Sequence, residues 1–256
     1  MSSSADKRYW NNKSRKIKSH HLEKNIARHK RKENINLIKG WTSLKEKSVL
    51  KTDLFEEMLI TDSFYDWLEK EARSVVGIDI SSEIVRKAQN NFPTANFRTE
   101  DVRKTSFKND SFDLVISNST LDHLPRKDMD GSLKELKRIT KKDGEIILTL
   151  DNKENKNYYL FYFINKYLNW AHFKQENCYS LKEITSMCEQ IGLEVIDYKG
   201  IIHIPSPFNK LMKVSKRLFG NKLDSYIRRS INKFHKKRKD LSTAWQIAVR
   251  LRKATS

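Results

Sequence analysis

The chain of 256 residues is long enough to bury one substantial hydrophobic core. Its formal net charge of +19 is unevenly distributed, because residues 1–47 carry 14 Lys or Arg against 4 Asp or Glu and residues 208–256 carry 15 against 2. The start of the chain is polar and lacks the apolar stretch of a signal peptide, and no apolar run reaches membrane-spanning length. The sequence therefore predicts a cytoplasmic globular domain with two strongly basic flanks.

Residues 1–44 form a basic extension with few apolar side chains. Residues 1–17 are rich in Ser, Lys and Asn, a composition that predicts disorder. Residues 19–37 contain enough helix-forming residues for one helix. We therefore expect the extension to be partly helical.

From residue 45 onward, short β-branched apolar runs alternate with segments of helical periodicity. The runs predict strands at 48–52, 74–79, 95–98, 112–117, 145–150, 193–198 and 243–251. Helices are expected at 53–72, after an N-cap at Ser81, at 131–140 and after Ser180. The last helix has the strongest local signal, because Ser180 and Glu183 form a capping box and Gly192 follows the apolar positions.

This alternation of strands and helices predicts an α/β fold, a doubly wound Rossmann-like sheet of seven strands with helices on both faces. Two segments read as insertions in a single domain that spans 45–256. One is aromatic-rich and lies at about 153–178, and the other is basic and amphipathic and lies at about 208–240. No metal site is predicted, because the two cysteines lack metal-ligand spacing and Cys188 falls on the inner face of a predicted helix.

Three predicted strands end in polar or acidic residues, which parallel strands bring to one edge of a sheet. Asp79 follows the second strand, Asp101 follows the third, and Ser117 and Asn118 end the fourth. In order and residue type this segment resembles the middle of a class I S-adenosylmethionine-dependent methyltransferase of the small-molecule type. The resemblance implies a mostly parallel sheet with an antiparallel last strand, and S-adenosylmethionine as the cofactor.

The resemblance also assigns roles around the nucleoside. Asp79 would accept hydrogen bonds from the ribose hydroxyls, with Ile80 next to it, since a carboxylate has two acceptor oxygens. Asp101 would meet the adenine amino group and Val102 would contact the ring. Two alternatives stay open: Glu100 could replace Asp101, and Asp79 could serve only to start the following helix.

The first strand departs from the family pattern, because the family has an acidic residue and a glycine-rich loop there. This chain has Lys51, Thr52 and Asp53 at that point, with no glycine between Gly40 and Gly77. The string from 50 to 57 resembles a methyltransferase subgroup with a glycine-less first motif.

In that variant site, Asp53 would meet the methionine ammonium, and Lys51 or Thr52 its carboxylate. Ser117 and Asn118 would lie along the methionine part. The alternative is that the loop no longer binds a cofactor.

His123 is the candidate general base, because an unperturbed histidine titrates close to neutral pH. A structural His that holds its loop is the alternative. The aromatic-rich insertion would cover the acceptor pocket or form a small second core. The basic insertion would lie on an anionic membrane surface, follow a nucleic-acid backbone, or pack on the domain with its charges in solvent.

The sequence thus predicts an enzyme that transfers a methyl group from S-adenosylmethionine to a small-molecule, lipid-linked or glycan-linked acceptor, at oxygen. One alternative is an RNA methyltransferase or RNA-binding relative that uses the basic flanks. The other is a non-catalytic scaffold at a membrane or partner surface. The expected location is cytoplasmic, with a peripheral position at the inner membrane face as a variant, and the sequence leaves the oligomeric state open.

Overall fold

The computed structural model describes residues 3–17, 24–156, 178–203 and 240–254. Its centre is a seven-stranded sheet with the order β3-β2-β1-β4-β5-β7-β6. The strands are β1 (Ser48–Thr52), β2 (Ser74–Asp79), β3 (Asn96–Thr99), β4 (Phe112–Asn118), β5 (Thr140–Asp151), β6 (Leu193–Ile201) and β7 (Gln246–Lys253). The helices are α1 (Ser3–Lys16), α2 (Lys24–Trp41), α3 (Phe64–Glu71), α4 (Ser82–Asn91), α5 (Met129–Ile139) and α7 (Leu181–Gln190).

The sheet has the predicted directions. Strands β1 to β5 pair in parallel, and β7 pairs antiparallel with both β5 and β6. The last strand is therefore the antiparallel one and lies next to the edge of the sheet, inserted between β5 and β6. The doubly wound seven-stranded fold predicted from the sequence is confirmed.

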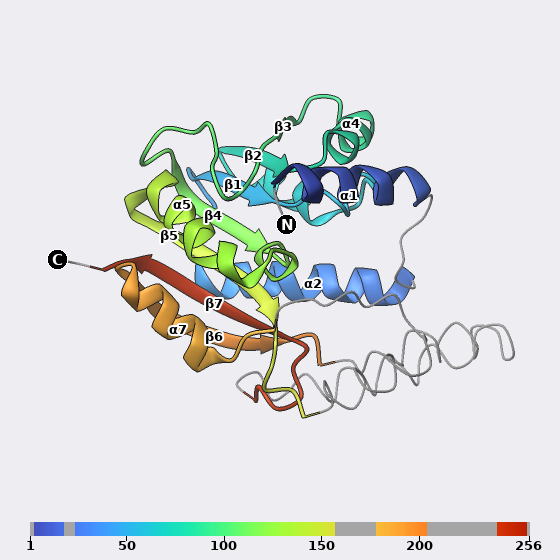
Figure 1. Ribbon diagram of the computed structural model, residues 1–256. Helices are drawn as coiled ribbons and strands as arrows, with labels where there is room; N and C mark the ends of the chain where they lie inside the picture. Colours follow the sequence, from blue (N-terminus) through green and yellow to red (C-terminus); the bar gives the residue numbers. More distant parts are fainter. Residues whose placement is uncertain (1–2, 18–23, 157–177, 204–239, 255–256) are drawn as a thin grey trace, which may run out of the picture.

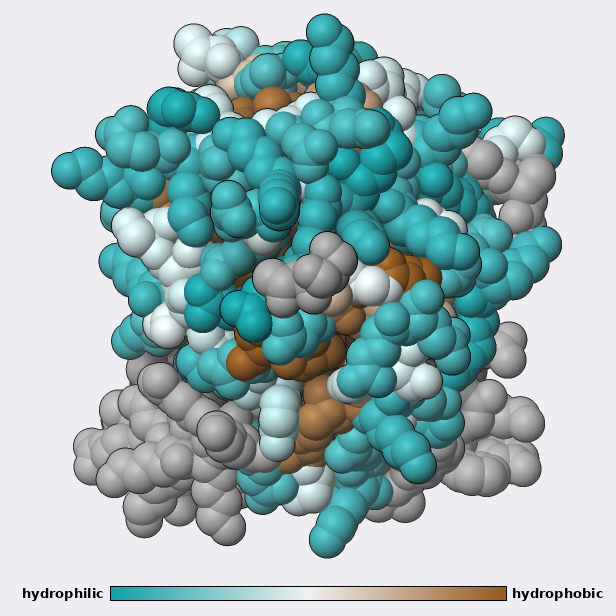
Figure 2. All heavy atoms as spheres, turned by 90° about the vertical axis from the view of Figure 1, so that its left-hand side faces the viewer, coloured by the Kyte–Doolittle hydropathy of each residue, from teal (hydrophilic) through white to brown (hydrophobic). Residues whose placement is uncertain are grey.

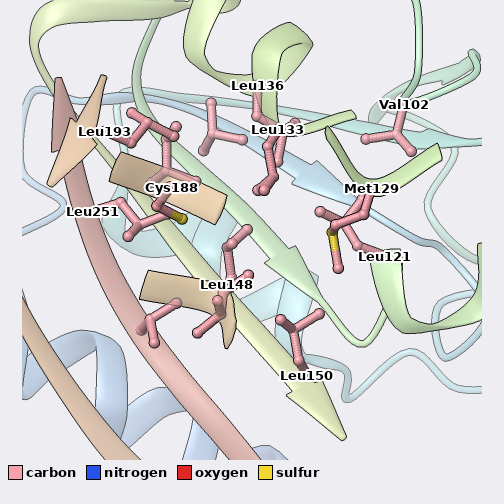
Figure 3. Packing of buried hydrophobic residues seen from close by; sticks show 14 of the residues in the cluster. Val102, Leu121, Met129, Leu133, Leu136, Leu148, Leu150, Cys188, Leu193 and Leu251 are labelled. Atoms are coloured by element: carbon pink, nitrogen blue, oxygen red, sulfur yellow. The ribbon is translucent and has the colours of Figure 1, made fainter. Parts of the chain in front are cut away.

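Helices cover both faces of the sheet (Figure 1). On one face, α5 and α7 pack on β4, β5 and β7 through a cluster that includes Leu133, Leu136, Leu148 and Cys188 (Figure 3). On the other face, α2 and α3 pack on β1 and β4 through a second cluster that contains Trp41. The sheet is buried between these two layers, as expected for parallel strands.

Local sequence signals place the helix starts. Ser63, Ser81 and Ser180 each accept a hydrogen bond from a backbone N–H of the first turn that follows. At α7 the capping box is complete, because the Glu183 carboxylate also accepts from the N–H of Ser180. These caps fix where the chain turns from the sheet edge into each helix.

Two sequence predictions are wrong. Residues 3–16 are helical rather than disordered, because α1 packs on α4 and the aromatic rings of Tyr9 and Trp10 have packing partners. The helix expected at 53–72 is confined to α3, and residues 55–62 form turns and bends. A buried ion pair described below fixes those turns and overrides the helical periodicity.

The aromatic-rich and basic insertions lie largely outside the described residues. No helix within the described ranges is long and apolar enough to cross a membrane. The face at the amino ends of the parallel strands is largely hydrophilic, with hydrophobic side chains showing in small patches near its centre and its upper edge (Figure 2). The polar and acidic side chains predicted for the site lie at the opposite edge.

Candidate functional site

The ends of β1, β2 and β4 lie next to one another at the carboxyl edge of the sheet (Figure 1). Thr52 at the end of β1 is in register with Ile78 of β2 on one side and with Ser117 of β4 on the other. The structure therefore brings Thr52, Asp79 and Ser117, predicted separately from the sequence, to one edge. Asp53, Ile80 and Asn118 follow directly in the chain.

Asp79 is buried and held firmly by the backbone. Its Oδ1 accepts a hydrogen bond from the N–H of Ser81 at 2.8 Å, and its Oδ2 accepts from the N–H of Leu54 at 3.1 Å. An ionised carboxylate has room for about four hydrogen bonds. Each oxygen of Asp79 thus keeps acceptor capacity for a ligand hydroxyl, while Ile80 beside it is half-buried.

The turn after β1 is built on a buried ion pair instead of glycines. The Lys51 ammonium lies 3.0 Å from the Glu57 carboxylate, and the two side chains are 2% and 0% exposed. Lys51 also donates to the carbonyl oxygen of Asp53, a residue with a φ of 86°. The second Glu57 oxygen accepts from the N–H of Tyr65 at 3.2 Å, which ties the turn to α3.

This arrangement changes the interpretation of Lys51. Burial alone would lower the pKa of Lys51, but the nearby Glu57 and Asp53 outweigh it and hold the pKa above its usual value. The Lys51 ammonium is therefore charged, and it stabilises the turn through its contacts with Glu57 and with the carbonyl of Asp53. A role for Lys51 in binding the carboxylate of a ligand, one of the two options drawn from the sequence, is not what this geometry favours.

Gly77 of β2 lets this turn approach the sheet closely. A Cβ atom at this position would lie 2.7 Å from a methyl carbon of Leu54 and 2.7 Å from the ring of Phe97. The absent side chain thus makes room for the residue whose N–H holds Asp79. The single glycine of this region lies in the second strand, whereas the family pattern places its glycines after the first.

Acidic side chains gather at this edge. Burial raises the pKa of Asp53. The charge of Lys51 lowers this pKa, but that of Glu57 raises it, so the pKa stays above its usual value. Burial and the neighbouring Asp53 raise the pKa of Asp79 to about 7, and burial with Glu57 raises that of Glu56 to about 7. Buried carboxylates that resist ionisation are stabilised by a cation placed among them, so the edge suits a positively charged ligand.

Hydroxyl groups line the edge between β1 and β4. The Thr52 hydroxyl lies 3.1 Å from that of Ser117 and 2.7 Å from that of Thr120. Asn118 accepts a hydrogen bond from Thr149 on β5 at 2.5 Å. These side chains form a polar lining with fixed orientations beside the acidic cluster.

Asp101 and Val102 follow β3 as predicted, and Val102 is buried in the core. The Asp101 carboxylate is bound by the Arg103 guanidinium at 2.8 Å, and the same guanidinium reaches Asp6 of α1 and Asp128 at 2.8 and 2.9 Å. Glu100, the alternative to Asp101, instead accepts hydrogen bonds from Ser106. Arg103 is thus the hub of a network that sequence reasoning missed.

Helix α1 lies across this edge at the tips of β1 and β2 (Figure 1). Its Asn11 accepts hydrogen bonds from the Ser81 hydroxyl at 2.6 Å and the Glu83 N–H at 3.3 Å. The Trp10 ring lies 6.4 Å from that of Phe55 and 5.3 Å from that of His123. The adjacent Tyr9 and Trp10 in an otherwise polar segment were the sequence signal that helix α1 packs on this edge.

His123 lies in a short 3-10 helix, Leu121–His123, directly after β4. Its ring meets Trp10 edge-on, and the residue retains an exposed surface. The preceding Asp122 is buried, and burial together with the nearby Asp151 raises its pKa well above the usual value. The sequence prediction singled out His123 and passed over the buried Asp122 beside it.

Comparisons with known proteins agree with this geometry. A family model described as a methyltransferase domain matches residues 60–148. No curated protein sequence matches the chain. The matched segment contains β2 to β4, α4, α5 and most of β5, and therefore includes Asp79, Asp101 and the residues that end β4.

Solved structures with the same fold are numerous. Magnesium protoporphyrin IX methyltransferase from Synechocystis PCC 6803, crystallised with bound S-adenosylhomocysteine, is 14% identical with a TM-score of 0.62, over 99% of this chain and 100% of that one. A possible histamine N-methyltransferase from Thermotoga maritima, described as S-adenosylmethionine-dependent, is also 14% identical with a TM-score of 0.62, over 98% and 100%. The 1,6-didemethyltoxoflavin N1-methyltransferase of Burkholderia thailandensis is 11% identical with a TM-score of 0.55, over 98% and 87%.

The chain therefore has the fold of class I methyltransferases, which confirms the resemblance drawn from its sequence. Within that fold it carries a variant turn after β1, in which the buried Lys51–Glu57 pair stands where glycines are expected.

Proposed function

We propose that the protein is an S-adenosylmethionine-dependent methyltransferase that acts at oxygen on a small-molecule, lipid-linked or glycan-linked acceptor. The observation that carries this proposal is the edge formed by β1, β2 and β4, where Asp79 lies among buried carboxylates in a methyltransferase fold. The matched family model and the similar enzymes crystallised with S-adenosylhomocysteine support the cofactor.

The residues at the edge fit such a cofactor in charge and in hydrogen-bonding capacity. Asp79 has free acceptor capacity for two ribose hydroxyls, next to the half-buried Ile80. Asp53 and the hydroxyls of Thr52 and Ser117 would hold the methionine end, with Asn118 beyond them. Asp101 and Val102 would lie at the adenine, with Asp101 fixed by Arg103.

When bound, the cofactor supplies an electrophilic methyl group on a positively charged sulfur. The work of the chain is to bind that cation, to align the acceptor with it and to exclude water. The raised pKa values of Asp53 and Asp79 follow from burial, and a cation at the edge would restore their ionised forms. Binding and ionisation of the site are therefore coupled.

Transfer from methyl-labelled S-adenosylmethionine to separate acceptor classes tests this function. Phenols and sugars, a membrane lipid extract and total RNA are offered in parallel to the wild type and to Asp79→Ala. The proposal predicts label in a hydroxyl-bearing small molecule, lipid or glycan, and none with the variant. Label in RNA alone would favour the RNA methyltransferase alternative, and no transfer to any class would contradict the proposal.

A further inference from the structure

Three buried oxygen atoms near the end of β5 have no hydrogen-bond partner among the described residues, and two of them are side-chain acceptors. One is Oδ1 of Asp122, whose residue is 1% exposed, and the other is Oε1 of Gln246, whose residue is 6% exposed. An unsatisfied buried polar atom is destabilising, so native proteins seldom keep one without a reason. One of these oxygens lies on the segment that follows β4 and the other on β7, where Gln246 bonds to Ser119 of that same segment, so a ligand between the two could complete the structure.

Asp151 links the two positions. It is in register with Gln246 across the β5–β7 pair, and residues opposite each other in a sheet are direct neighbours. Asp151 is also the group whose charge, after burial, most raises the pKa of Asp122. Gln246 donates through its Nε2 to the hydroxyl of Ser119, directly after β4. The hydrogen bond to Ser119 fixes the amide of Gln246, and its Oε1 remains without a donor among the described residues.

Charged and titratable groups from several elements face this place. Asp151 of β5 and Lys30 of α2 both act on Asp122. His123 follows in the same 3-10 helix and is also influenced by Asp151 and Lys30. Tyr179, which directly pairs with the backbone of Asp151, is fully buried and its hydroxyl has no partner among the described residues. The cluster lies beside Ser117 and Asn118, on the side of β5 and β7.

We propose that Asp122 and Gln246 form the acceptor subsite, which binds a methyl acceptor carrying two neighbouring hydroxyl groups, and that Asp122 receives the proton of the hydroxyl that is methylated. This inference rests on the proposed function, and it names the class of acceptor that would bind at the proposed active site. The two free atoms are both acceptors, so the ligand must offer donors. A diol presents two O–H donors on neighbouring atoms, one for each acceptor.

The chemistry balances without any further reagent. The acceptor oxygen forms its bond to the methyl carbon as the bond between that carbon and the cofactor sulfur breaks, and the sulfur keeps the electron pair as a neutral thioether. The hydroxyl proton passes to the Asp122 carboxylate in its ionised form, which the nearby Lys30 favours. A carboxylate whose pKa is raised by burial is a stronger base in its ionised form than an exposed one, and Oδ1 of Asp122 is the atom left to accept the proton.

Binding of simple diols tests the subsite without an assay of activity. Ligand-observed NMR on the protein saturated with S-adenosylhomocysteine compares catechol with its monomethyl ether, guaiacol. We expect catechol to bind about tenfold or more tightly than guaiacol, a preference lost in Asp122→Asn and in Gln246→Leu. Equal binding of the two compounds, or no binding of catechol, would overturn the proposal.

Thermal stability provides a second measurement. Because Asp122 is buried without full partners, Asp122→Asn is expected to raise the unfolding midpoint, as is usual where a group is kept for function. Asp113→Asn is the matched control. Asp113 accepts hydrogen bonds from Ser48 and Lys141, so this substitution should lower the unfolding midpoint. A fall with Asp122→Asn equal to that of the control would show a structural aspartate and contradict the proposal.

The two proposals fail in different ways. If S-adenosylhomocysteine does not bind the folded wild type, the proposed function is wrong, and the sign of the Asp122→Asn shift still decides whether this aspartate is structural. If it binds and the catechol preference is absent, the cofactor assignment stands and the acceptor subsite is wrong.

Discussion

The ends of β1 and β2 lie side by side in the sheet, yet they are built in different ways. At β2 the chain follows the family pattern, with Asp79 at the end of the strand held by two backbone N–H groups. At β1 the expected glycines are absent, and the buried Lys51–Glu57 pair fixes the turn from beneath. The same edge therefore depends on the missing side chain of Gly77 in one strand and on a buried ion pair beside the other.

This difference shows what a glycine-rich loop has to achieve. The turn must bring a backbone N–H close to the acid of the next strand, and here the N–H of Leu54 does so at 3.1 Å. The residue before it, Asp53, takes the left-handed conformation that glycine usually supplies. The Lys51 ammonium on the carbonyl of Asp53 stabilises that conformation.

Breaking the ion pair is expected to have the largest effect on the β1 turn. Lys51→Met leaves Glu57 as a buried, unpaired carboxylate and should lower the free energy of unfolding by about 3 to 5 kcal/mol. Chemical denaturation measures the loss. The double variant Lys51→Met/Glu57→Gln removes both charges but keeps an acceptor for the N–H of Tyr65, so it should recover much of the stability. A single variant as stable as the wild type would show that the pair does not support the turn.

Adding a side chain at Gly77 of β2 should have the next largest effect on stability. Gly77→Ala forces a methyl group against Leu54 and Phe97 and should cost about 1 to 3 kcal/mol of unfolding free energy. Gly131→Ala is the matched control, because nothing lies within 4 Å of its added carbon and it is in helix α5. That variant should be neutral or more stable. Equal effects of the two substitutions would contradict the close approach.

The raised pKa of Asp79 predicts a dependence of stability on pH in the ligand-free protein. Its pKa is about 7 in the folded state against 3.8 ordinarily, so its contribution favours folding below pH 4 and is lost as the pH rises towards 7. Relative to Asp79→Asn, the wild type should therefore lose more than about 1 kcal/mol between pH 4 and pH 7. Denaturation of both proteins at several pH values measures this difference. A constant difference would show that Asp79 ionises normally.

The smallest expected effect concerns the backbone of Asp53. Asp53→Gly and Asp53→Ala both remove the side-chain acceptor for the N–H of Phe55. Glycine adopts a φ of 86° without steric cost, whereas alanine does not. The glycine variant should therefore be more stable than the alanine variant by about 1 kcal/mol. Thermal or chemical unfolding of the two proteins measures the difference. If alanine is as stable, the left-handed turn is not a constraint.

Much of the fold could be predicted because it depends on local patterns. The alternating apolar runs gave the strand order along the chain, and Ser81 and Ser180 marked helix starts correctly. Asp79, Ser117 and Asn118 were predicted at one edge because parallel strands end together.

The missed parts depend on contacts between distant residues. Helix α1 is held by a hydrogen bond that Ser81 donates to Asn11 and by an ion pair between Arg103 and Asp6, which composition cannot reveal. The turns at 55–62 replace a helix because Glu57 pairs with Lys51 rather than facing solvent. Asp122 was passed over because its burial is visible only in the fold.

The central claim is that an edge without a glycine-rich loop still binds the cofactor. Calorimetric titration of S-adenosylmethionine and S-adenosylhomocysteine into the wild type and Asp79→Ala tests it most directly. We predict micromolar binding to the wild type and a loss of about a hundredfold in the variant, since two hydrogen bonds to a charged group are removed. No binding to a well-folded wild type, or equal binding to both proteins, would contradict this account.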